Sequence, residues 1–225
     1  KHLDVRKGEI LGIAGLVGAG RTETLRALFG ADDADEKHVK IEGKEYTFNN
    51  PSEAIAAGFV YMTENRKFDG AALGLSVEEN ITMASLQKFS KCGRMQEAKA
   101  KSNAQEYCKK LNIRTPSIDQ KVMNLSGGNQ QKVIIGKWLT RTAKVMVFDE
   151  PTRGIDVGAK YEIYSLMNDL SDQGIAIIMI SSDLPEILGM SDRVAVFKDG
   201  RVTAVLDRKD ADSETIMKYA TGKLS

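Results

Sequence analysis

The residues best placed to do chemistry form a glycine-rich turn between an apolar run and a helical segment. Glycines at positions 15, 18 and 20 allow the backbone to curl so that its N–H groups point inward, and a helix N-terminus adds positive potential. The turn matches the phosphate-loop pattern G-x-x-x-x-G-K-[ST] except at one position, where arginine replaces lysine. We therefore predict a phosphate-binding loop, with these contacting residues: Gly15, Leu16, Val17, Gly18, Ala19, Gly20, Arg21, Thr22 and Glu23.

The arginine at position 21 changes what this loop can do. Lysine is a compact charge on a flexible stem, whereas arginine is a planar fork that docks bidentately. Because phosphoryl transfer depends on positioning and charge stabilisation, we expect nucleotide binding to persist and hydrolysis to weaken. Thr22 still offers a hydroxyl to Mg²⁺. The alternatives are a glycine-rich turn without a ligand and a dinucleotide fingerprint, which is disfavoured because Glu23 stands at its third glycine position.

A second candidate anion site lies in the octet Leu-Ser-Gly-Gly-Asn-Gln-Gln-Lys at residues 125–132. A serine and two glycines at a helix N-terminus present a hydroxyl and free N–H groups to an anion. The predicted contacts are Ser126, Gly127, Gly128 and Gln130. The alternative is an ordinary serine N-cap followed by glycines.

Two acids follow an apolar, β-branched run at residues 144–148. Asp149 is placed to hold Mg²⁺, and Glu150 to orient or deprotonate an attacking water. A pair of acids at the end of a buried strand is moderately specific by itself. It becomes highly specific after the phosphate loop and the octet in this order.

The segments around these residues predict an α/β fold in which parallel strands end at a ligand crevice. Apolar runs predict strands at residues 9–14, 59–62, 144–149 and 178–180, and turn signals predict hairpins at residues 39–48 and 193–206. Periodic segments predict helices at residues 23–29, 52–57, 76–86, 95–111, 127–142, 183–190 and 213–221.

Composition limits the classes of protein to consider. The chain has 225 residues, 42% of them hydrophobic, which is enough for one α/β domain with an added helical part. A net charge of +1 argues against a nucleic-acid partner. Its two cysteines, Cys92 and Cys108, have no neighbours that would make a metal site or a disulfide framework. No apolar run reaches the ~18 residues that a membrane-spanning helix needs.

Taken together, these motifs resemble the nucleotide-binding domains of ABC proteins. Residues 15–22 resemble the Walker A loop, residues 125–132 the ABC signature, Asp149-Glu150 the Walker B motif with its catalytic glutamate, and Gly154-Ile155-Asp156 the D-loop. The resemblance covers essentially the whole chain. It is strongest to the second, C-terminal nucleotide-binding domain of bacterial monosaccharide importers of the ribose, galactose and xylose type. It implies a P-loop NTPase fold with a mostly parallel core sheet, a small antiparallel β layer and a helical subdomain.

The chain departs from the ABC pattern at three positions associated with the γ-phosphate. Besides Arg21, Glu64 stands at the position of the Q-loop glutamine, and Ser182 at that of the switch histidine. An ionised glutamate cannot donate a hydrogen bond, and serine is too short to bridge the gap that a histidine spans. Neither His2 nor His38 lies in a motif that could replace it.

The resemblance implies an ABC-type ATPase with ATP and Mg²⁺ bound, coupled to carbohydrate uptake and weak as an isolated domain. Residues 1–225 would form one such domain, with a helical subdomain at about residues 76–128, within a longer two-domain subunit. The implied partners are a fused N-terminal ABC domain, transmembrane permease subunits that meet residues 74–90, and indirectly an extracytoplasmic sugar-binding protein. The implied location is the cytoplasmic face of the cell membrane.

Two other functions are compatible with a modified nucleotide site. One is a non-catalytic regulatory module that binds nucleotide. The other is a soluble ABC ATPase of translation or DNA repair, against which the near-zero net charge argues, because binding to nucleic acid depends on neutralising phosphates. The basic segment at residues 88–94 is either a docking face or, as is usual for charge runs, a solvated surface.

Overall fold

The computed structural model describes residues 3–65, 70–91 and 93–223. The chain divides into two compact units, which are described separately. Unit 1 comprises residues 1–61, 144–151 and 167–225, and unit 2 comprises residues 62–143 and 152–166.

Unit 1 is built on a six-stranded sheet in the order β10-β9-β1-β8-β7-β4. The strands β1, β8, β9 and β7 run parallel, and β10 pairs antiparallel with β9. Asp199 and Gly200 join β9 to β10 with positive φ at both positions, as a tight hairpin turn requires. The strands are β1 (Ile10–Gly15), β4 (Phe59–Met62), β7 (Val145–Asp149), β8 (Ala176–Ile180), β9 (Arg193–Lys198) and β10 (Arg201–Asp207).

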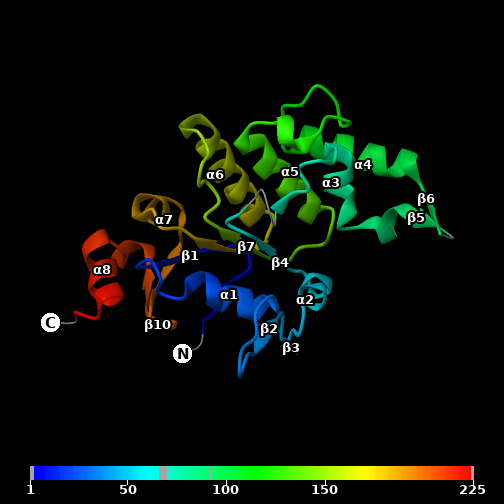
Figure 1. Cartoon of the computed structure of the whole chain (residues 1–225). Helices are drawn as coiled ribbons and strands as arrows, with labels where there is room; N and C mark the ends of the chain where they lie inside the picture. The colour runs from blue at the N-terminus through cyan, green and yellow to red at the C-terminus, as the bar shows by residue number, and fades with distance from the viewer. Residues whose placement is uncertain (1–2, 66–69, 92, 224–225) are drawn as a thin grey trace. The chain divides into compact units, whose positions relative to one another are not determined.

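Helices and a small hairpin complete unit 1. The hairpin is β2 (Val39–Ile41) with β3 (Lys44–Tyr46), and the helices are α1 (Arg21–Phe29), α2 (Pro51–Ala57), α7 (Leu184–Met190) and α8 (Ser213–Thr221). Figure 1 shows α1 leaving the loop that follows β1. Leu25 and Phe29 of α1 join Leu11 and Ile13 of β1 in a buried apolar core. Because this core fixes α1 against β1, the loop between them has a rigid base.

Unit 2 is mainly helical. Its elements are α3 (Val77–Met83), α4 (Glu97–Lys110) and α5 (Gly127–Leu139), with a short hairpin of β5 (Ser90–Lys91) and β6 (Arg94–Met95). The helices α3, α4 and α5 pack against one another. Ser76 and Glu79 form a capping box at the start of α3. Helix α6 (Val157–Asp172) begins in unit 2 and ends in unit 1.

The predicted fold class is confirmed, including the mostly parallel sheet and the small antiparallel layer. Some details of the predicted elements differ. The helix predicted at residues 76–86 ends at Met83, and the one predicted at residues 127–142 ends at Leu139. Met95 belongs to the hairpin strand β6 and not to the long helix, and neither this hairpin nor α6 was predicted. The predicted helical subdomain at about residues 76–128 lies within unit 2, and the domain assignment stays a prediction. His2 and Cys92, both discussed from the sequence, lie outside the described residues.

Candidate functional site

The predicted phosphate loop joins β1 to α1 in unit 1. Gly15, Gly18 and Gly20 all have positive φ, so the backbone makes the tight curl that the pattern predicts. A Cβ at Gly15 would lie 2.7 Å from the carbonyl oxygen of Phe197, so the backbones approach too closely for any side chain there. Val17 is 93% exposed at the tip of the loop, whereas Ala19 packs into the core. The loop is therefore anchored at its base and open at its tip, and helix α1 directs its first N–H groups into it.

Arg21 does not extend freely from this loop. Its side chain is buried, and Nη1 donates a hydrogen bond of 2.7 Å to the carbonyl oxygen of Ser181, just beyond β8. Arginine reaches this carbonyl because its guanidinium is broad and lies at the end of a long stem. The cation that the pattern assigns to phosphate therefore also ties α1 to the end of β8.

Asp149 lies beside the loop at the end of β7. Its carboxylate is buried and accepts hydrogen bonds from the Thr22 hydroxyl, at 3.0 and 3.3 Å, and from the Tyr61 hydroxyl, at 2.6 Å. Burial raises the pKa of Asp149, and the bonds from Tyr61 and Thr22 oppose that rise. A carboxylate beside a hydroxyl is an oxygen donor set of the kind that Mg²⁺ prefers, so Asp149 and Thr22 fit the predicted metal.

Glu150, the next residue, adopts a left-handed backbone conformation with φ of 48°. A side chain makes this conformation unfavourable, and such strain is common at functional sites. Two contacts hold it in place. Its N–H donates to the carbonyl oxygen of Ile180 at 2.9 Å, and the Ser182 hydroxyl donates to its carboxylate at 3.2 Å. Burial raises the pKa of Glu150, against the opposing effects of Ser182 and the Arg21 charge, which makes it a stronger base than an exposed glutamate.

Sheet register explains why these residues meet. Ile13 of β1 and Asp149 of β7 both pair with Ile180 of β8. Because parallel strands end at the same edge of the sheet, the phosphate loop, the acid pair and Ser182 gather at one edge of unit 1. The structure thus brings together the sequence-predicted residues of this unit: Gly15, Gly18, Gly20, Arg21, Thr22, Asp149, Glu150 and Ser182.

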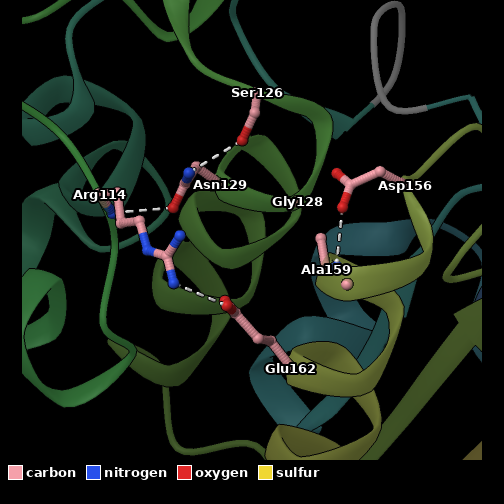
Figure 2. Close-up of a pocket in the computed structure, with 8 residues that line it drawn as sticks. Arg114, Ser126, Gly128, Asn129, Asp156, Ala159 and Glu162 are labelled. Atoms are coloured by element: carbon pink, nitrogen blue, oxygen red, sulfur yellow. Dashed lines mark hydrogen bonds and ion pairs between the residues drawn. The ribbon is translucent and has the colours of Figure 1, made fainter.

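The octet forms a separate site in unit 2, at the start of α5. Ser126 is the N-cap residue, yet its side chain makes no capping hydrogen bond. Its oxygen instead accepts a 2.9 Å hydrogen bond from Asn129 Nδ2, and Asn129 Oδ1 accepts a 2.8 Å bond from the Arg114 N–H. These residues line a cavity of about 340 Å³, with Asp156 and Glu162 among its other lining residues. Figure 2 shows how the labelled side chains lie around it.

Two octet residues make contacts that stabilise the local structure. Gly128 is buried, and a Cβ there would lie 2.7 Å from the Cβ of Ala159 on α6. Gln130 was predicted to contact the anion, but it is 7% exposed and its amide donates to the carbonyl oxygens of Val122 and Leu125. Gln130 therefore fixes the loop that leads into α5.

Glu64 of unit 2 is half-buried, and its carboxylate forms an ion pair with Arg153. The negative charge of Glu64 is therefore partly compensated by a neighbouring cation. Sequence reasoning missed Tyr61 and Asn129. Tyr61 was hidden within an apolar strand, and Asn129 was passed over for its neighbour Gln130, although residues 126 and 129 lie three apart on one helix face.

Metal-binding groups of three or more His, Cys, Asp or Glu residues are absent from the part of the chain that the structure describes. Cys108 is a free, half-buried thiol. None of the helices in the described ranges is both long and apolar enough to cross a bilayer.

Comparisons with known proteins identify the family and the fold. The model of the ABC transporter family matches residues 1–153. Ribose import ATP-binding protein RbsA of Oceanobacillus iheyensis is 51% identical over 218 residues, which are 97% of this chain and 44% of that protein. RbsA of Streptococcus agalactiae gives the same identity and coverage. The chain thus spans less than half the length of these relatives.

Among solved structures, a nucleotide-free ATP-binding cassette from an ABC transporter matches with a TM-score of 0.80. The two chains are 23% identical, and the match covers 96% of this chain and 87% of the other. At this identity the likeness concerns the fold.

Proposed function

Because this chain belongs to the ABC transporter family, we propose that it is an ATP-binding domain of a bacterial sugar importer, in which ATP binding and hydrolysis drive carbohydrate uptake. The proposal extends to this chain what the names of its relatives say of them. The substrate class would be monosaccharides such as ribose or galactose. We expect no residue of this chain to contact the sugar, so the chain itself does not select it.

The domain's own nucleotide site would bind ATP and hydrolyse it slowly. The observation that carries this proposal is the hydrogen bond from Arg21 to the Ser181 carbonyl, which commits part of the cation to the protein. Asp149 and Thr22 would hold Mg²⁺, which neutralises phosphate charge when bound. Glu150 keeps a carboxylate for orienting water, so the site retains the residues for slow turnover.

The signature of the domain would act at a second site. In this proposal Ser126 and the start of α5 contact the terminal phosphate of ATP held by a sister ABC domain. The relatives, more than twice as long as this chain, leave room for such a domain in the same polypeptide, and we propose that it is fused on the N-terminal side. The two sites would then be unequal. The sister's site is completed by the intact signature of this domain, whereas the domain's own site carries Arg21 in place of the usual lysine.

The other partners follow from this assignment. We propose transmembrane permease subunits, which would meet residues 74–90, and an extracytoplasmic sugar-binding protein that delivers the sugar to them. The domain would then work at the cytoplasmic face of the membrane as a peripheral subunit.

The test compares Ser126→Ala with Glu150→Gln in the full two-domain subunit assembled with its permease. Ser126→Ala is expected to lower ATP turnover by about tenfold or more, since it removes a donor aimed at a phosphate. Glu150→Gln is expected to have a much smaller effect, because it alters the slow site. Equal large losses would contradict unequal sites, and unchanged sugar uptake in both variants would support a regulatory module instead.

A further inference from the structure

The side chain of Asn129 bridges two parts of the signature site. Its Nδ2 donates to the Ser126 hydroxyl oxygen at 2.9 Å, and its Oδ1 accepts from the backbone N–H of Arg114 at 2.8 Å. Figure 2 shows Asn129 between these two partners, at the wall of the cavity. Since all of these residues belong to unit 2, the bridge is internal to that unit.

The two hydrogen bonds fix which way the amide faces. A backbone N–H can only donate, so the oxygen of the amide must face Arg114. The NH₂ group must then face Ser126, and Ser126 must accept from it. A flipped amide would set two donors against each other at Arg114.

This orientation has a consequence for the Ser126 hydroxyl. A serine hydroxyl has one hydrogen to donate and two lone pairs. The bond from Asn129 occupies one lone pair, and within the described residues the Ser126 side chain makes no other hydrogen bond, so the hydrogen is available for an acceptor in the cavity. A phosphate oxygen only accepts, and it suits such a hydroxyl.

We propose that Asn129 is a positioning residue that presents the Ser126 hydroxyl as a donor to the terminal phosphate of ATP. The inference rests on the proposed function of the signature. It assigns to Asn129 an action through Ser126, and it takes Gln130 out of the phosphate site, because the Gln130 amide is bonded to backbone carbonyls.

Two substitutions distinguish a changed orientation of the Ser126 hydroxyl from the simple loss of the Asn129 side chain. Asn129→Ala leaves the hydroxyl free to rotate. Asn129→Asp keeps an oxygen that can accept from Arg114, so the loop anchor is retained, but its other oxygen takes the Ser126 hydrogen and brings a negative charge. We expect kcat/KM for ATP to fall by about three- to tenfold in Asn129→Ala and further in Asn129→Asp. Asn103→Asp is the matched control, because Asn103 Oδ1 only accepts from Thr140 and lies on α4.

The experiment uses the full two-domain subunit and measures kcat/KM together with binding of ADP and of a non-hydrolysable ATP analogue. In the Asn129 variants, binding of the analogue should weaken by no more than the loss in kcat/KM, while ADP binding changes less than about twofold, because ADP lacks the terminal phosphate. In a Ser126→Ala background, Asn129→Ala should have no further effect.

Four results would overturn the proposal. Equal weakening of ADP and analogue binding would assign Asn129 a structural role, and so would an Asn129→Ala effect that persists without the Ser126 hydroxyl. An unchanged kcat/KM in Ser126→Ala would reject the signature contact itself, and with it the proposed function. An effect of Ser126→Ala without one of Asn129→Asp would reject only the role of Asn129.

Discussion

Tyr61 gives the sharpest test of how the acid at the end of β7 is held. Its hydroxyl donates to the buried Asp149 carboxylate at 2.6 Å, and its ring packs 5.6 Å from that of Phe29. Tyr61→Phe keeps the ring and removes only the hydroxyl. A hydrogen bond to a charged acceptor contributes about 1.5–3 kcal/mol to stability, so the variant should lose about 2 kcal/mol. For a chain of this size that lowers Tm by about 4–8 °C.

A matched control is available in Tyr107. Its hydroxyl donates at 2.7 Å to the carbonyl oxygen of Leu139, a neutral acceptor, so Tyr107→Phe should cost about 1 kcal/mol. Both variants are compared with the parent chain by urea unfolding. The effect of Tyr61→Phe should also shrink by at least half when Asp149 is replaced by Asn, because the acceptor is then neutral.

Two results would refute this reasoning. One is a loss in Tyr61→Phe no larger than that in Tyr107→Phe. The other is an equal loss from Tyr61→Phe with Asp or Asn at position 149, which would show that the charge of the carboxylate contributes nothing to the bond.

Three further predictions concern other parts of the chain. Arg21→Lys should increase ATP hydrolysis at the domain's own site and lower the free energy of unfolding by about 1 kcal/mol, because the bond to Ser181 weakens. A phosphate-release assay measures the first effect and urea unfolding the second. Unchanged hydrolysis would mean that Arg21 does not limit the site. Gly128→Ala should destabilise the chain by about 1–3 kcal/mol, since its Cβ would clash with Ala159, whereas Gly158→Ala, whose Cβ makes only an ordinary 3.5 Å contact with Asp156, should be neutral or stabilising in a thermal melt. Lys137 is 8% exposed, and burial lowers its pKa to about 8, so its folded pKa lies below its unfolded value and stability is gained as pH rises from about 8 toward 10.5. Relative to Lys137→Met, the parent should gain about 1–2 kcal/mol between pH 7 and 9.5 in urea unfolding, and a pH-independent difference would contradict the buried charge.

The sequence predicts the nucleotide edge of unit 1 because local patterns and sheet geometry suffice there. The apolar runs that end at Gly15, Asp149 and Ile180 are recognisable as buried strands, and parallel strands bring their ends together. Glycine spacing then predicts the loop, and the confirmed positive φ values follow from it.

Side-chain partners could not be predicted in the same way. Arg21 and Ser181 are 160 residues apart, and Tyr61 and Asp149 are 88 apart, so no local pattern connects them. Asn129 and Gln130 are both polar residues in the first turn of α5, and both could face the anion. What distinguishes them is the loop before the helix, whose carbonyls at Val122 and Leu125 bond the Gln130 amide.

The loop after β8 links two of the three departures from the ABC pattern. Ser181 gives its carbonyl to Arg21, and the adjacent Ser182 gives its hydroxyl to Glu150. A shift of this loop would therefore change the positions of both the Arg21 guanidinium and the Glu150 carboxylate, since each is bonded to one of two consecutive loop residues. Both departures therefore involve the same loop. The long side chain of Arg21 reaches the Ser181 carbonyl, whereas the short side chain of Ser182 reaches the neighbouring Glu150 carboxylate. Replacing Arg21 by lysine would therefore weaken the link between this loop and α1 and leave the bond from Ser182 to Glu150 in place.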